Sequence, residues 1–105
     1  MLGEFEQLVL LAIMRSGREA YGVPIRQTIV DRSGRDVSLA AVYKTLTRLE
    51  EKGLVTTRVG EPTPERGGRR KTYYALTAPG QRAVRQSVEV LRRMMRGLDL
   101  GLDTP

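Results

Sequence analysis

The sequence predicts a mainly α protein with a small two-stranded β-wing. Apolar residues recur at three- and four-residue steps in three successive segments before residue 53, as on the buried faces of helices. Two short segments rich in β-branched and aromatic residues then flank a loop of glycine, proline and arginine. The last segment, 81–96, contains no helix breaker. This order of elements is that of a winged helix-turn-helix with a long C-terminal helix.

The first three segments are expected to be helices. Residues 4–15 carry a wide apolar stripe. Residues 21–30 repeat the pattern, with Pro24 in the first turn, where its missing N–H removes no hydrogen bond. Ser38 is a good N-cap for the third helix, whose apolar residues recur at steps of three, four and three until Gly53.

A wing and a last helix are expected after the third helix. The strands are predicted at 54–59 and 71–76, with residues 60–71 as the basic loop of the wing. Thr77 is the expected N-cap of the last helix, which runs to Arg96. We therefore expect a winged helix-turn-helix at residues 1–80, a dimerisation helix at 81–98 and a frayed tail at 99–105.

Composition excludes most catalytic chemistry. The chain has 105 residues, a size typical of one domain. It contains no cysteine and no histidine, which excludes disulfides, Cys/His zinc sites and histidine-based catalysis. The one carboxylate pair considered, Asp99 and Asp103, lies in a tail broken by glycines, so we expect neither an enzyme nor a cofactor. No apolar run approaches the roughly 20 residues that cross a bilayer, and the N-terminus lacks the positive region of a signal peptide. A cytoplasmic protein without a membrane partner is expected.

The charge balance and the third helix together indicate a polyanionic partner. Lys and Arg total 18 against 12 Asp and Glu, a net charge of +6. Opposite the apolar arc of the third helix lie small residues near its start and donors further along, as a helix in the major groove of DNA requires. Tyr43, on the flank of this arc, is expected to pack against Leu39 and to reach a phosphate. The predicted contacts are Ser38, Ala40, Ala41, Tyr43, Lys44 and Arg48. The alternative is that the two cations merely pair with Glu50 or Glu51.

The loop of the wing is the second basic feature. Cations surround a Gly-Gly pair there, so that a flexible tip presents guanidinium groups to a DNA backbone or minor groove. The predicted wing contacts are Arg66, Arg69, Arg70 and Lys71. The alternative is a solvated hairpin tip whose glycines serve turn geometry. Together, helix 38–52 in the major groove and wing 60–71 predict double-stranded DNA as the partner.

Four stretches of the sequence carry a more specific pattern. VSLAAVYKTLTRLEEKGLV contains a helix ending in RLE-x-x-G-L, and GGRRKTYYALTAPG contains a lysine-tyrosine strand that runs into L-T-x-x-G. LGEFEQLVLLAI and the Tyr21-Gly22 pair complete the pattern. These stretches resemble the PadR family of bacterial transcriptional regulators. The resemblance implies a homodimeric winged helix-turn-helix repressor that binds a partly palindromic operator.

The resemblance also implies that the first and last helices build the dimer interface. Five apolar residues of the last helix follow one another at steps of four, three, four and three, the heptad spacing of a seam between two helices. The last helix also carries five arginines, whereas Glu4 and Glu6 open the first helix, so the two helices are expected to pair across subunits. The predicted interface consists of Phe5, Leu8, Val84, Val88, Leu91, Met95 and Leu98. Packing within one protomer is the alternative for this stripe.

Two further questions concern effectors and alternative partners. Some family members respond to small molecules, and the drug-sensing ones stack flat ligands on tryptophans of the last helix. This chain has no tryptophan, and Met94 and Met95 are expected to pack in the core or the seam. The residues therefore support no ligand site, although an inducer remains compatible with the family. The alternative function is a winged-helix module that binds another protein through the same outward face.

Overall fold

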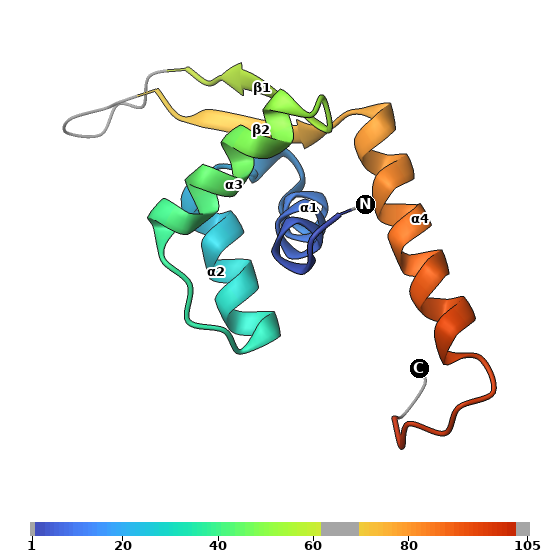
Figure 1. The fold of residues 1–105 in the computed structure, drawn as a ribbon. Coiled ribbons are helices and arrows are strands. Elements are labelled where there is room, and N and C mark those ends of the chain that lie inside the picture. The colour runs from blue at the N-terminus through green and yellow to red at the C-terminus, as the bar shows by residue number, and fades with distance from the viewer. Residues whose placement is uncertain (1, 62–69, 103–105) are drawn as a thin grey trace.

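The computed structural model describes residues 2–61 and 70–102. The elements are α1 (Glu4–Ser16), a short 3₁₀ turn η1 (Gly17–Glu19), α2 (Gly22–Ser33), α3 (Leu39–Glu51), β1 (Val55–Val59), β2 (Thr72–Leu76) and α4 (Ala78–Met95). In Figure 1, α1 lies at the centre, α2 and α3 on one side of it, the hairpin above them and α4 on the other side. This is the predicted fold, mainly helical with a two-stranded antiparallel wing and a long C-terminal helix.

One apolar core lies between α1, α2 and α3. Its fully buried large side chains come from all three helices, and they are Val9, Leu10, Ile25, Val42, Leu46 and Leu49. Leu39, expected in the buried arc of α3, is only half-buried, whereas Thr45 is buried in that arc. The periodicity of the apolar residues therefore locates the buried side of each helix.

Local signals set the ends of the helices. The Ser38 hydroxyl accepts the N–H of Ala41 at 3.1 Å, and the Thr77 hydroxyl accepts the N–H of Gly80 at 3.1 Å. Gly34 ends α2 with φ 72°, a left-handed conformation that favours glycine. Both predicted N-caps are confirmed.

The hairpin is antiparallel and is tied to the helices at one edge. Its register runs from Val55 opposite Leu76 to Val59 opposite Thr72. On the outer edge of β2, the N–H of Tyr74 donates to the carbonyl of Ala20 at 2.8 Å. The hairpin is therefore attached directly to the segment between α1 and α2.

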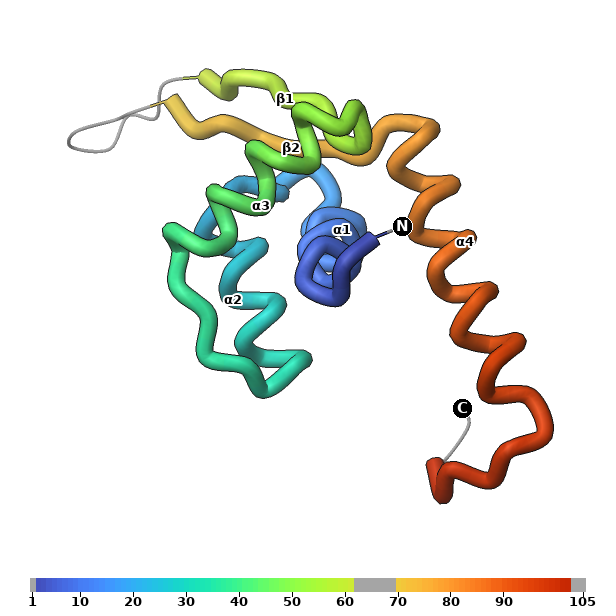
Figure 2. Tube along the Cα trace, in the orientation of Figure 1, coloured from blue at the N-terminus to red at the C-terminus, as the bar shows by residue number. Residues whose placement is uncertain are grey.

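The first turns of α4 pack on the winged helix, and the rest of α4 projects from it. Gly80 lies so close to the carbonyl of Leu54 that a Cβ atom would collide with it. Val84 is 7% exposed and belongs to the core, and Ser87 is also buried. Figure 2 shows the later turns of α4 leaving the other helices, and the molecule measures 54 × 27 × 23 Å. Within residues 2–61 and 70–102, no helix combines the length and apolar character needed to cross a membrane.

Candidate nucleic-acid interface

The outward side of α3 is the centre of the candidate interface. Ser38, Ala40, Tyr43, Lys44, Thr47 and Arg48 are exposed, and Ala41 is half-buried. At 100° per residue, Ala40, Lys44 and Thr47 lie opposite the buried side, whereas Tyr43 and Arg48 lie on opposite flanks. The small Ala40 precedes the cationic Lys44 by one helical turn on the same face. On this side of α3, the small Ala40 leaves room for a partner to approach the helix closely, and Lys44 supplies a hydrogen-bond donor one turn later.

The cations of α3 are not engaged with the nearby carboxylates. In the part of the chain that the structure describes, the ion pairs are Arg35 with Glu4 and Lys52 with Glu6. Glu50 instead accepts a hydrogen bond from the Thr57 hydroxyl at 3.3 Å. Lys44 and Arg48 therefore do not form the alternative ion pairs with Glu50 or Glu51 in the described part of the chain.

Tyr43 has a packing partner that sequence reasoning missed. A Cβ atom on Gly22, at the start of α2, would collide with the hydroxyl end of the Tyr43 ring. On the same flank of α3, burial raises the pKa of the Tyr74 hydroxyl, and the nearby Tyr43 and Glu50 raise it further. Tyr74 therefore stays protonated and neutral across the physiological range. The sequence pattern singled out the Tyr21-Gly22 pair, but it did not indicate that Gly22 contacts Tyr43.

The root of the wing carries a cluster of cations and aromatic rings. Arg70 is exposed, and the ammonium of half-buried Lys71 lies 4.5 Å from the centre of the Tyr21 ring. Arg58, which sequence reasoning did not single out, lies 4.4 Å from the centre of the Tyr73 ring. The pairing of the two predicted strands could have indicated this contact, because Arg58 and Tyr73 lie opposite each other in the register of β1 and β2. The other two predicted wing contacts, Arg66 and Arg69, lie outside the described residues.

Glu6 and Lys52 connect the start of α1 to the end of α3. The Lys52 ammonium donates to the Glu6 carboxylate at 2.7 Å, and the Gly3 N–H donates to the same group at 2.9 Å. Burial alone raises the pKa of Glu6, but these two hydrogen bonds and the charges of Lys52 and Arg48 outweigh it and hold the pKa below its usual value. These hydrogen bonds hold the C-terminal end of α3 against the start of α1.

The expected pairing of Glu4 and Glu6 with arginines of a partner's last helix needs correction. Glu4 pairs with Arg35, and Glu6 pairs with Lys52, both within one protomer. Arg35 and Lys52 reach these carboxylates because the segment before α3 and the turn after α3 lie against the start of α1. Counting the charges along single helices does not reveal this tertiary contact.

The predicted interface residues divide into two groups. Phe5 and Leu8 are half-buried against the core, and Val84 is part of it. Three residues on later turns of α4 are between 38% and 52% exposed, and these are Val88, Leu91 and Met95. The last helix was expected to include Leu98, but it ends at Met95, because Gly97 adopts a left-handed φ of 85°. Leu98 therefore lies beyond the helix and is 63% exposed. Met94 is 72% exposed, so neither it nor Met95 is packed in the core. The apolar stripe of α4 is thus covered at its start and exposed beyond it.

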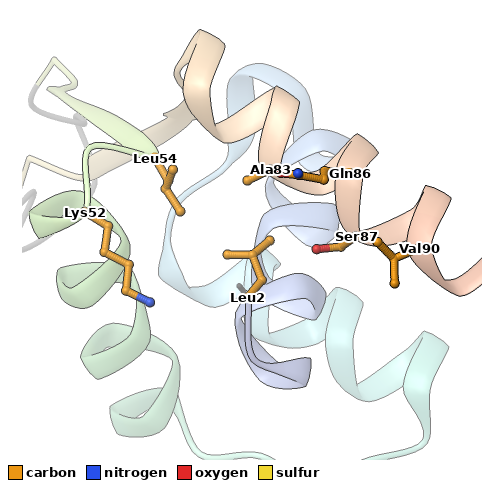
Figure 3. A pocket seen from close by; sticks show the side chains of 7 residues that line it. All are labelled: Leu2, Lys52, Leu54, Ala83, Gln86, Ser87 and Val90. Carbon is orange, nitrogen blue, oxygen red and sulfur yellow. The ribbon is translucent and has the colours of Figure 1, made fainter.

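A groove of about 500 Å³ lies where α4 leaves the winged helix. Figure 3 shows side chains from the start of α1, the end of α3, the turn before β1, and α4 around it. Its lining residues are Leu2, Lys52, Leu54, Ala83, Gln86, Ser87 and Val90. Met94 and Met95 are not among them. The groove is mainly apolar, with the Lys52 ammonium as its one charged lining group within the described residues.

Comparisons with known proteins agree with this arrangement. A family model described as "Transcriptional regulator PadR-like family" matches residues 10–86. A transcriptional regulator from Clostridium thermocellum is 24% identical, with a TM-score of 0.70 and coverage of 87% of this chain and 85% of that one. A PadR family regulator from hypervirulent Clostridium difficile R20291 is 24% identical, with a TM-score of 0.65 and coverage of 87% and 94%.

Bacillus subtilis PadR, solved in complex with operator DNA, has a TM-score of 0.66 at 20% identity. The match covers 81% of this chain and 47% of that protein. At these identities, the three structures show that the fold is shared. None of the curated proteins matches the chain.

Proposed function

The chain belongs to the PadR-like family of transcriptional regulators, and from this premise we propose that it is a homodimeric repressor of a partly palindromic operator. The family consists of winged-helix DNA-binding regulators and not of enzymes. In the proposal, residues 38–52 enter the major groove and residues 60–71 contact the backbone or the minor groove. Residues 1–80 form the DNA-binding part, and residues 81–98, which are helical as far as Met95, form the dimerisation part.

The observation that carries the proposal is the outward side of α3. Ala40 lets the helix backbone approach the base edges, and Lys44, one turn later on the same face, extends into solvent. Within the described residues, Lys44 forms no ion pair, so it keeps its charge available for a base edge or a phosphate. The wing root supplies further cations beside α3, among them exposed Arg70.

Two observations support the dimer and its operator. The later turns of α4 expose an apolar stripe that a second copy would cover. In the proposed twofold dimer, the two α3 helices would enter half-sites about 34 Å apart, one turn of DNA. Bacillus subtilis PadR, which has the same fold, is solved in complex with operator DNA. This supports extending DNA recognition to this chain.

The test is selection of bound sequences from a random duplex pool at about 150 mM salt. We expect an enriched inverted repeat that binds roughly 10³-fold or more tightly than a scrambled duplex. Absence of enrichment, with binding that disappears as salt rises, would contradict the proposal. It would instead favour the winged-helix module that binds another protein.

Single substitutions test the assigned contacts on the selected operator. Lys44→Ala is expected to weaken binding and alter base preference, because Lys44 lies at the centre of the outward arc. Arg70→Ala is expected to weaken binding to all duplexes evenly and to reduce the log-log salt slope by about 0.9, the value for one phosphate. Arg93→Ala, which removes an exposed cation of α4, is the control. Equal affinities in the three variants would overturn the assignment.

A further inference from the structure

The Tyr21-Gly22 pair is a motif that the proposed function leaves without a role. Tyr21 is the N-cap residue of α2, and Gly22 is the first residue of that helix. The preceding residue, Ala20, accepts the hydrogen bond from Tyr74 that attaches the hairpin to the helices. The pair therefore lies where the wing, α2 and α3 meet.

Tyr21 contacts the root of the wing. Its ring meets the ring of Tyr73 edge to face, with centres 5.6 Å apart and planes at 76°. The Lys71 ammonium lies 4.5 Å from the centre of the Tyr21 ring, and the Arg58 guanidinium lies 4.4 Å from that of Tyr73. Two rings thus lie between two cations, in the order Lys71, Tyr21, Tyr73 and Arg58. Lys71 directly precedes β2, so this row of side chains lies at the end of the hairpin that carries the loop.

Gly22 contacts the recognition helix. It is buried, and a Cβ atom there would collide with the hydroxyl end of the Tyr43 ring. Because residue 22 has no side chain, this ring lies directly on the first turn of α2. Tyr43 is exposed on its other side and flanks the outward arc of α3. Tyr21 and Gly22, adjacent residues at the start of α2, therefore contact the wing and the recognition helix, respectively.

The base and the middle of the hairpin are held by several contacts. Val55 is buried in the core, and the N–H of Tyr74 donates to the carbonyl of Ala20. The Thr57 hydroxyl donates to Glu50 of α3, and the Arg58 guanidinium donates to the carbonyl of Arg18. The contacts of Tyr21 add an attachment closer to the loop, at Lys71 and Tyr73.

We propose that Tyr21 and Gly22 are positioning residues that fix the angle between the wing and α3. The consequence for DNA rests on the proposed function, because the cations of the wing and those of α3 must meet one duplex at the same time. The angle itself is a property of the free protein. It is therefore measured independently of DNA.

The distance between a spin label on α3 and one on the wing reports this angle. The chain has no cysteine, so Glu51→Cys on α3 and Glu61→Cys at the wing root give two unique sites, and both positions are exposed. Doubly labelled protein is diluted with an excess of unlabelled chain, so that the distances measured lie within one protomer. We expect a narrow distance distribution in the parent and in Tyr21→Phe, which keeps the ring, and a broad or shifted one in Tyr21→Leu. Lys71→Met, which removes the cation above the ring, serves as a second variant and is expected to broaden the distribution.

The same variants, without labels, are then tested on the selected operator. Tyr21→Leu is expected to lower the affinity about tenfold and to reduce the salt slope by about 0.9 for each phosphate that the wing no longer reaches, with base preference unchanged. Tyr21→Phe, which keeps the ring, is expected to leave the affinity and the salt slope at the values of the parent protein. In an Arg70→Ala background, the effect of Tyr21→Leu should shrink, because both changes act through the wing.

The outcomes separate the two proposals. An unchanged distance distribution in folded Tyr21→Leu and Lys71→Met would overturn the positioning role, whatever happens on DNA. Failure of the parent protein to select an operator would contradict the proposed function instead. Circular dichroism and thermal unfolding identify any variant that has lost its fold.

Discussion

Leu91→Ala is the sharpest test of the dimer. Leu91 is 52% exposed on the projecting turns of α4, in the middle of the apolar stripe. Full burial of a leucine side chain is worth about 1.5 to 3 kcal/mol, so covering the exposed half is worth about 1 kcal/mol per protomer. A twofold dimer contains two copies, which makes the expected loss about 2 kcal/mol. This corresponds to a roughly 30-fold rise in the dimer dissociation constant.

The measurement is sedimentation equilibrium over a dilution series of each variant. Val23→Ala is the matched control, because Val23 is 54% exposed but lies on α2, away from α4. It is expected to leave the dissociation constant unchanged. Circular dichroism of both variants establishes that the helices are intact.

The reasoning would be refuted by equal dissociation constants for Leu91→Ala and Val23→Ala. It would equally be refuted by a parent protein that stays monomeric at every concentration. In either case, the exposed stripe of α4 would not be the surface that joins two copies.

Three further predictions concern stability. Gly80→Ala is expected to lower the free energy of unfolding by about 1 to 3 kcal/mol, because the new Cβ atom would collide with the Leu54 carbonyl. Gln81→Ala, at the exposed neighbouring position, should have little effect, and equal urea midpoints for the two variants would contradict the prediction. Ser38→Ala removes the N-cap of α3 and is expected to lower the same quantity by about 1 kcal/mol in urea unfolding; an unchanged midpoint would show that the cap contributes nothing. Because the folded-state pKa of Glu6 lies below its ordinary value of 4.5, its stabilisation is complete above that value and is lost as the pH falls through the folded-state pKa. The stability difference between the parent and Glu6→Gln should therefore shrink as urea unfolding is repeated below pH 4.5, and a difference independent of pH would contradict the role of the carboxylate.

Local signals were sufficient for the helices and the strands. The Ser38 and Thr77 hydroxyls cap the helices that follow them, as their positions before apolar or breaker-free segments indicate. The outward position of Lys44 follows equally from helical geometry, since it lies opposite the buried residues of the same helix. Each of these features depends on residues within a few turns of one another.

Other parts of the site depend on residues far apart in the chain. Glu6 was expected to face a partner subunit, but Lys52 already engages it within the protomer. Val84 is the first residue of the predicted heptad pattern, yet it is buried in the core, because Gly80 brings the first turns of α4 against Leu54. A repeat along one helix specifies a side of that helix and not which neighbour covers it.

The sequence by itself determined the order of the elements, the buried side of each helix and the outward residues of α3, because these follow from the periodicity of the helix and from capping chemistry. Its motifs also indicated the family that the comparisons confirmed. Only the tertiary structure decided which charges are already paired, where the apolar stripe of α4 becomes exposed, and that Tyr21 and Gly22 contact Tyr73 and Tyr43. The physical reason is that such contacts join residues about 20 to 50 positions apart, and they exist only after the helices and the hairpin have packed around one core.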